Sequence, residues 1–156
     1  MSGFRTFLVP YDFSPHARAA LAAALELARR LEAQVHVLHV VQTPSYPYAY
    51  GVHPAAAAHL PVDTVELRDA AMRSLEQVVS ELGPSAPKVQ PHVVEGTAIA
   101  DTIHAVAEQR GADLIVMGTH GRTGLAHVFL GSVAERTLRK APCPVMTVQA
   151  PEEEGR

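Results

Sequence analysis

The stretch Asp113–Ser132, with the sequence DLIVMGTHGRTGLAHVFLGS, decides the fold of this chain. After its first residue it opens with the apolar run LIVM, which is typical of a strand buried on both faces. A glycine-rich loop follows, and helical spacing begins at the Gly131-Ser132 pair. Glycine suits a backbone that turns sharply or approaches a ligand, and the unpaired N–H groups at a helix start attract anions. The stretch therefore predicts a strand, a phosphate-type loop and a helix in succession.

The same alternation of patterns continues along the rest of the chain. Short apolar runs that predict strands lie at Phe4–Pro10, Val35–Val41, Val89–Val94 and Val145–Val148. Apolar residues at helical spacing run from Leu21 to Leu31, from Leu67 to Leu82, from Ile99 to Val106 and within Ser132–Lys140. Ser14 and Pro15 supply an N-cap and a first-turn proline for the first helix. Five strands alternating with four helices predict one α/β domain with a parallel sheet over residues 1–150, followed by an acidic tail, 151–156.

Three strands carry features that predict their place in the sheet. Pro91 lies inside the third strand, and because proline has no N–H to donate to a ladder, this strand is expected at an edge. The fourth strand is apolar on both faces and is expected in the interior. The last strand, Val145–Val148, is short, apolar and uncharged, so it would be an aggregation hazard as a bare edge. Pairing with a second copy would cover it, which predicts a homodimer.

Composition limits the partners and the compartment. The chain has 156 residues, 13 basic and 16 acidic, and its net charge of −3 argues against nucleic acid as the main partner. No apolar run approaches the roughly 18 residues of a membrane span, and the N-terminus leads directly into a strand without a signal peptide. Cys143 is the single cysteine, so it forms no internal disulfide and is expected to pack as a small apolar side chain. We expect a soluble, cytoplasmic domain with no membrane partner.

Asp12 is the polar residue that follows the first strand. Ligands of such sheets bind beyond the carboxyl ends of the strands, where the winding direction reverses. If the first and fourth strands are neighbours, Asp12 and the loop after Gly118 share one crevice. A carboxylate is a poor companion for phosphate, so Asp12 is expected to accept a hydrogen bond from a base or a ribose hydroxyl. The alternative is a turn or cap residue before the first helix.

The glycine loop also has a plainer interpretation. Ser132-Val-Ala-Glu135 fits a capping box, which would explain the serine without a ligand. Capping alone does not explain four glycines, at positions 118, 121, 124 and 131, so an anion site is favoured. The loop matches neither the Walker A pattern nor the dinucleotide fingerprint. Arg122 is the nearest cation: it either reaches a terminal phosphate or is a solvated loop residue.

Neither metal binding nor catalysis has a matching motif. His36 and His39 are three residues apart, so on one strand they point to opposite faces and cannot share a metal ion. The other histidines show no helical His-x-x-x-His pair and no Cys/His cluster. Ser14, Ser132 and Cys143 are potential nucleophiles, but none lies in a nucleophile elbow or beside an evident base. We therefore expect no metal site and no catalytic residues.

The pattern Gly118-x2-Gly121-x9-Gly131-Ser132 resembles the ATP-binding signature of the universal stress protein family. The similarity extends over about residues 4–148. It includes the first strand and turn, VPYDFS at 9–14, the second strand, LHVV at 38–41, the end of the third strand, VEG at 94–96, and the segment APCPV at 141–145. The composite pattern is more specific than any single glycine pair.

This resemblance implies a Rossmann-like sheet of order 3-2-1-4-5 and a homodimer formed by antiparallel pairing of the last strands. It also implies roles for individual residues. The adenine and ribose are bordered by Pro10, Asp12 and Val40. Met117 and Gly118 lie beneath the nucleotide. The phosphates are held by Gly121, Gly131, Ser132 and Val133, with His120 and Arg122 adjacent. The family does not determine the segment 42–61, whose prolines, tyrosines and alanines either cover the site or play no part in it.

The resemblance leads to the hypothesis of a cytoplasmic, dimeric ATP-binding protein that acts in the stress response, with ATP held with or without Mg²⁺. Binding, rather than turnover, is its expected primary event. One alternative is an enzyme that hydrolyses ATP slowly or phosphorylates itself. Another is a dimeric interaction module that never holds nucleotide, against which the intact glycines argue. The downstream protein partner cannot be named from the sequence.

Overall fold

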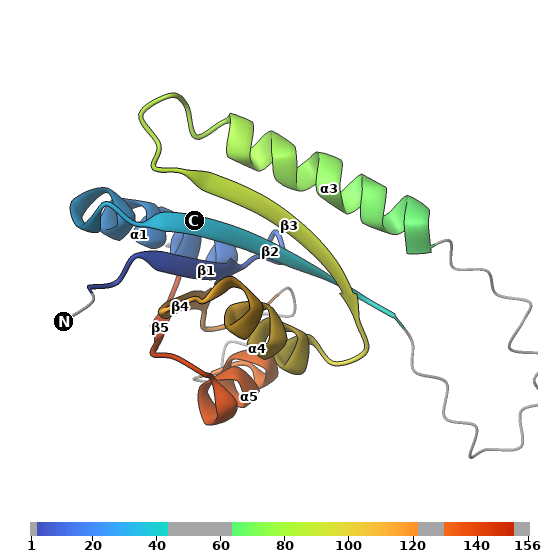
Figure 1. Cartoon of the computed structure of the whole chain (residues 1–156). Coiled ribbons are helices and arrows are strands. Elements are labelled where there is room, and N and C mark those ends of the chain that lie inside the picture. Colours follow the sequence, from blue (N-terminus) through green and yellow to red (C-terminus); the bar gives the residue numbers. More distant parts are fainter. Residues whose placement is uncertain (1–2, 44–63, 122–129, 152–156) are drawn as a thin grey trace, which may run out of the picture.

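The computed structural model describes residues 3–43, 64–121 and 130–151 (Figure 1). Its strands are β1 (Thr6–Pro10), β2 (Gln34–Gln42), β3 (Val89–Gly96), β4 (Leu114–Gly118) and β5 (Val145–Val148). Its helices are α1 (Pro15–Leu31), α3 (Thr64–Ser80), α4 (Ile99–Arg110) and α5 (Ser132–Lys140). The predicted elements are all present, with ends that differ by a few residues. No helix in the described ranges is long and apolar enough to cross a membrane.

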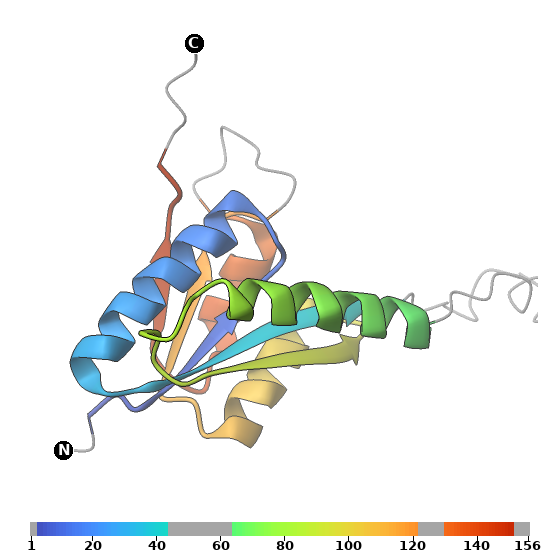
Figure 2. The same ribbon diagram turned by 90° about the horizontal axis from the view of Figure 1, so that it is seen from above.

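The strands form a single parallel sheet in the order β3-β2-β1-β4-β5. Helices α1 and α3 cover one face, and α4 and α5 cover the other (Figures 1 and 2). The winding direction reverses between β1 and β4, which are neighbours in the sheet. This confirms the expected fold and strand order. It also places the segments that follow β1 and β4 side by side at the carboxyl ends of these strands.

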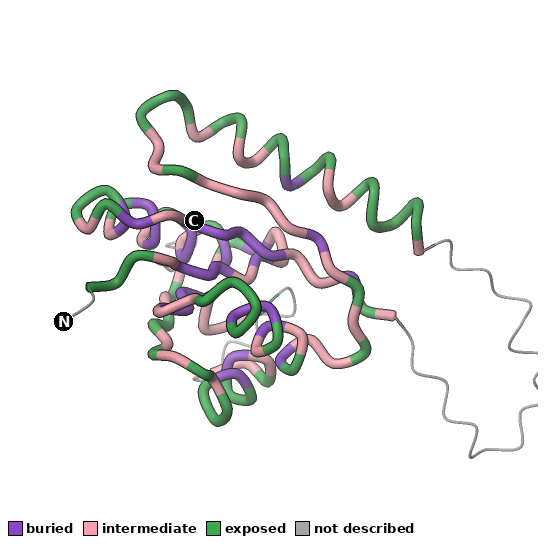
Figure 3. Tube along the Cα trace, viewed as in Figure 1, coloured by how far each residue is buried: buried purple, intermediate pink, exposed green. Residues whose placement is uncertain are grey.

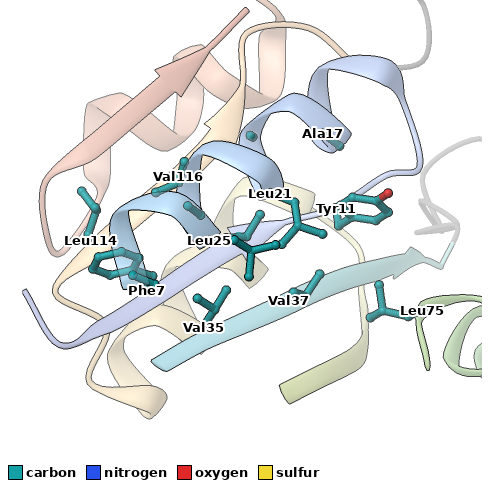
Figure 4. Close-up of a cluster of buried hydrophobic side chains, with 14 of the residues drawn as sticks. Phe7, Tyr11, Ala17, Leu21, Leu25, Val35, Val37, Leu75, Leu114 and Val116 are labelled. Atoms are coloured by element: carbon teal, nitrogen blue, oxygen red, sulfur yellow. The ribbon is translucent and has the colours of Figure 1, made fainter. Parts of the chain in front are cut away.

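The centre of the sheet is buried on both faces. Phe7, Leu8 and Val9 of β1 are fully buried, because alternate side chains enter the two helical layers. Phe7 and Val9 pack in one cluster with residues of α1, and Figure 4 shows Phe7 of this cluster beside Leu114. Leu8 packs with α4 on the opposite face. The core therefore holds β1 and β4 rigidly beneath the loops that follow them.

Helix α1 begins as the sequence predicts. Ser14 is the N-cap, its hydroxyl accepts a hydrogen bond from the Ala17 amide at 3.1 Å, and Pro15 occupies the first turn. The helix ends at Glu32, whose φ of 54° is left-handed. Its buried face carries small and branched residues: Ala17, Ala20, Leu21, Ala24, Leu25 and Ala28. The alanines let α1 lie close to the sheet.

The apolar stripe predicted for α3 is buried only in part. Leu75 is fully buried, but Leu67 is 48% exposed and Val65 is 64% exposed. The first turns of α3 extend past the end of β3, so only the later part of the helix covers the sheet (Figures 2 and 3). The helical spacing from Leu67 to Leu82 therefore predicts the helix but not its burial, because periodicity does not say where the sheet beneath a helix stops.

The hydrogen bonds of β3 explain how it accepts a proline. The carbonyls of Lys88 and Gly96 accept from the amides of Val35 and Thr43 on the β2 side, at 2.8 and 3.0 Å. Because backbone groups alternate along a strand, the even-numbered residues of β3 face β2 and Pro91 faces the free edge. Its missing N–H therefore costs no ladder bond. This confirms that β3 is an edge strand and shows that Pro91 also removes one donor from that edge.

A histidine pair links β2 to β3 on the α4 face. His36 Nδ1 lies 2.8 Å from His92 Nε2, and Arg110 Nη2 lies 3.4 Å from His92 Nδ1. Arginine only donates, so His92 Nδ1 accepts, and His92 donates from Nε2 to His36. Burial, reinforced by Arg110 and His36, lowers the pKa of His92 from 6.5 to about 4. Burial, reinforced by Arg110 and Lys88, also lowers the pKa of His36. Both imidazoles are therefore neutral near pH 7.

This pair predicts loss of stability in mild acid. The folded-state pKa of His92 lies below 6.5, so between pH 6.5 and about 4 the unfolded chain binds more protons and stability falls as pH falls. We expect His92→Gln, which cannot titrate, to lose about 1–2 kcal/mol less stability than the parent chain between pH 7 and pH 5. Urea denaturation at several pH values measures this difference. Parallel stability curves for the two proteins would contradict the assignment.

Candidate functional site

The segments after β1 and β4 meet at the carboxyl edge of the sheet. If a Cβ atom were added to Gly121, it would lie 2.9 Å from Asp12 Oδ2. Asp12 is half-buried and Gly121 is exposed. The structure thus brings Asp12 and the start of the glycine loop together at the carboxyl ends of β1 and β4, as expected from the adjacency of the two strands.

Asp12 is a turn residue before α1, which was the alternative considered for it. Its Oδ1 accepts a hydrogen bond from the Ser14 amide at 3.0 Å, which closes a tight turn before α1. Phe13, between Asp12 and Ser14, has a φ of 65°, so the turn includes a residue in the left-handed conformation. The second carboxylate oxygen, Oδ2, is the atom near Gly121. The turn therefore fixes the carboxylate beside the start of the glycine loop.

The ends of the glycine loop are joined at a narrow neck. The Gly131 amide donates to the Thr119 carbonyl at 2.6 Å. A Cβ on Gly131 would lie 3.1 Å from that carbonyl oxygen and 3.4 Å from the Cα of His120. The absence of a side chain at position 131 therefore permits the close approach. Arg122, predicted beside the phosphates, lies outside the described residues, as do most of the segment 42–61 and the acidic tail after Pro151.

Helix α5 begins at this neck without a side-chain cap. Gly131 is the N-cap, Ser132 is the first helical residue, and no side-chain hydrogen bond caps the helix. The capping-box interpretation is therefore wrong: Ser132 lies one position too late, and the Glu135 carboxylate instead pairs with Arg139 at 2.8 Å. The amides of the first turn carry the positive end of the helix dipole, which suits an anion.

The apolar candidates are all at least half-buried. Met117 is buried, whereas Pro10, Val40 and Val133 are half-buried. Met117, Val40 and Val133 pack in one cluster on the α4 and α5 face of the sheet. They belong to β4, β2 and the first turn of α5, so three elements contribute to this cluster.

Two residues beside the loop were not singled out from the sequence. His16, in the first turn of α1, has its ring 5.2 Å from the ring of His120. The hydroxyl of Thr119 lies 3.0 Å from His120 Nδ1. The sequence does indicate one feature of His16: it lies two residues after the Ser14 cap, so it is in the first turn of the helix that begins at the carboxyl end of β1.

The potential nucleophiles do not form a catalytic arrangement in the described part of the chain. Burial, reinforced by Asp113, raises the pKa of the Cys143 thiol, so the reactive thiolate is disfavoured. Burial also raises the pKa of Tyr11, an effect opposed by Arg18 and reinforced by Asp12. Ser14 is occupied as a helix cap. Among the described residues, no three His, Cys, Asp or Glu side chains are placed to hold a metal ion.

Two open hollows lie away from this crevice. One, of about 520 Å³, lies at the amino ends of β1 and β2 and is lined in part by Arg5, Arg29 and Lys88. The other, of about 530 Å³, lies between the end of β3 and α4, around Gly96 and Asp101. Because open parallel sheets bind ligands where the winding direction reverses, we favour the crevice between Asp12 and Gly121 over either hollow.

Comparison with known proteins finds similarity over almost the whole chain. The model of the universal stress protein family matches residues 3–149. Universal stress protein MJ0531 of Methanocaldococcus jannaschii is 32% identical over 151 residues, which are 97% of this chain and 85% of that protein. The solved structure of MJ0577 from the same organism has a TM-score of 0.77 at 28% identity, and the match covers 96% of this chain and 99% of that one. The universal stress protein from Archaeoglobus fulgidus in complex with dAMP shares the fold, with a TM-score of 0.56, 21% identity, and coverage of 95% and 99%.

Proposed function

The chain belongs to the universal stress protein family, and we propose that it binds ATP in the crevice between Asp12 and the glycine loop. The observation that carries this proposal is the neck of the loop, where the Gly131 amide meets the Thr119 carbonyl at the uncapped start of α5. The neck holds the start of the loop beside the first turn of α5, whose N–H groups lack partners within the helix and suit a phosphate.

The two ends of the nucleotide would meet different chemistry. The amides of Ser132 and Val133, in the first turn of α5, would receive the phosphates. Gly131 would hold the neck of the loop beside them, because its own amide donates to Thr119. Asp12, held by its turn, would accept a hydrogen bond from the ribose or the adenine amino group. Any Mg²⁺ would be bound mainly through the phosphates, because the described residues hold no cluster of metal ligands.

Binding rather than turnover is the proposed primary event. The serine after Asp12 is committed to capping α1, and the Cys143 thiol has a raised pKa. Neither residue is activated as a nucleophile. We therefore propose a cytoplasmic stress-response factor whose ATP-bound state differs from its free state on a surface that partners contact.

Mass analysis of small molecules released by denaturing the freshly purified protein tests this proposal. We expect ATP to be recovered. Recovery of ADP together with phosphate release from added ATP would instead support slow hydrolysis. A labelled protein after incubation with γ-phosphate-labelled ATP would support self-phosphorylation. A protein that carries no nucleotide and gives no heat on titration with ATP would leave only the interaction module.

We also propose that the free edge of β5 forms a homodimer. The Ile115 amide donates to the Pro144 carbonyl and the Thr119 amide to the Val148 carbonyl, so the even-numbered residues of β5 face β4. The backbone groups of Val145 and Thr147 therefore point outward. Met146 is 38% exposed on this strand. Unlike the β3 edge, this edge carries no proline.

A proline at position 147 is expected to separate the dimer. Thr147→Pro removes an outward N–H without breaking a bond to β4, so the fold should persist while strand pairing between copies is lost. Sedimentation analysis should change from twice 16.7 kDa to 16.7 kDa. Thr147→Val, which keeps the amide, is the matched control and should stay dimeric. A dimer that survives Thr147→Pro would place the interface elsewhere.

A further inference from the structure

The hydrogen-bond ladder between β4 and β5 changes partners where the glycine loop begins. The Thr119 amide donates to the Val148 carbonyl at 2.9 Å. In a regular parallel ladder, the next bond would run from the Ala150 amide to the Thr119 carbonyl. Here that carbonyl accepts from the Gly131 amide at 2.6 Å. The Ala150 amide donates instead to His16 Nδ1 at 3.0 Å.

His16 therefore replaces the Thr119 carbonyl as the acceptor for the Ala150 amide, because that carbonyl is bonded to Gly131. Its side chain comes from the first turn of α1, and it reaches the ladder because α1 starts at the same edge of the sheet. Since Nδ1 accepts a hydrogen bond, the imidazole that makes this contact is neutral and carries its proton on Nε2. Two donors, Gly131 and Ala150, thus have two separate acceptors.

The packing around His16 fixes the ring in this position. A Cβ on Gly118 would lie 2.8 Å from His16 Cβ and 2.9 Å from its backbone carbonyl carbon. The start of α1 therefore rests directly on the end of β4. On its other side, the imidazole is near the ring of His120, with the centroids 5.2 Å apart. His16 is thus in contact with the glycine loop and with the segment after β5 at once.

We propose that His16 is a positioning residue for the nucleotide loop. By accepting the Ala150 N–H, it leaves the Thr119 carbonyl to Gly131 and so keeps the neck of the loop closed. Without this acceptor, the Ala150 amide competes with the Gly131 amide for Thr119, and the neck loosens. This inference rests on the proposed ATP site for its effect on affinity, but its effect on the neck does not require nucleotide.

Two substitutions separate the acceptor from the ring. His16→Phe keeps an aromatic ring near His120 but removes the acceptor. His16→Asn removes the ring but places an amide oxygen close to the position of Nδ1. The measurements are hydrogen exchange of the Gly131 amide in the nucleotide-free protein, followed by NMR, and calorimetric titration with ATP. Circular dichroism and thermal unfolding establish that each variant is folded.

We expect His16→Phe to speed exchange at Gly131 about tenfold and to weaken ATP binding about fivefold, a size typical of coupling between adjoining groups. His16→Asn should restore both values to near those of the parent chain. The inference is overturned if His16→Phe leaves Gly131 exchange unchanged, or if His16→Asn behaves like His16→Phe. If the parent chain binds no ATP, the proposed function fails, and Gly131 exchange in the free proteins still decides the role of His16.

Discussion

Gly121→Val is expected to weaken ATP binding by at least about 100-fold, which corresponds to about 2.7 kcal/mol. The new Cβ would lie 2.9 Å from Asp12 Oδ2, so the carboxylate has to rotate out of the crevice. The two methyl groups would then occupy the space that we assign to the nucleotide. Isothermal titration with ATP measures the loss.

Folding should be nearly unaffected by this change. Gly121 is exposed, and the atom that a Cβ would meet is the end of a side chain that can move. We expect the free energy of unfolding to stay within about 1 kcal/mol of the parent value. Gly3→Val is the matched control, because a Cβ at position 3 has no atom within 4 Å. Unchanged ATP affinity in Gly121→Val would remove the crevice from consideration as the site.

Gly118→Ala is expected to have the opposite profile, with its main effect on stability. A Cβ at this position would lie 2.8 Å from His16 Cβ, 2.9 Å from the His16 carbonyl carbon and 3.1 Å from its oxygen. These atoms belong to the first turn of α1, so relief requires the helix to shift on the sheet. We expect the free energy of unfolding to fall by about 3 kcal/mol, the upper part of the range for overpacking.

Urea denaturation of Gly118→Ala and of Gly3→Ala measures this effect, since the second variant adds the same methyl group in open space. An equal stability of the two variants would mean that α1 does not rest on β4 as described. Because ATP would bind next to this contact, added ATP should recover part of the lost stability by mass action.

Much of the fold could be predicted from the sequence because its decisive features are local. The apolar runs, the Ser14-Pro15 cap and Pro91 each follow from the preferences of single residues or short segments, and all three agree with the structure. The crevice between Asp12 and Gly121 could be predicted for a related reason. Both residues follow buried strands, and neighbouring parallel strands end at the same edge.

The remaining features depend on contacts between distant parts of the chain. The bond from Ala150 to His16 joins residues 134 positions apart, and no spacing in the sequence indicates it. The pair of His36 and His92 depends on the register of β2 and β3 and on the position of α4. The bounds of α5 agree with the prediction, but Ser132 and Glu135 have the spacing of a capping box and do not form one, because Gly131 is the N-cap.

The carboxyl ends of the central strands and the edge strand β3 differ in the roles that we expect for their residues. At the carboxyl ends of β1 and β4, glycines permit close approaches between the loop, α1 and a carboxylate fixed by its turn, next to the first turn of α5. On β3, Pro91 removes a hydrogen-bond donor from the free edge, and the neutral histidine pair links β3 to β2. We therefore expect changes near the glycine loop to alter binding and changes in the histidine pair to alter stability.

Calorimetric titration of the nucleotide-free chain with ATP is the sharpest test of whether the protein binds this nucleotide. Bound nucleotide is first removed by unfolding and refolding, and the refolded protein is checked by circular dichroism. We predict saturable binding of one ATP per chain, which Gly121→Val abolishes and Gly3→Val retains. An absence of binding by the refolded parent chain, or equal binding by the parent chain and Gly121→Val, would contradict the account.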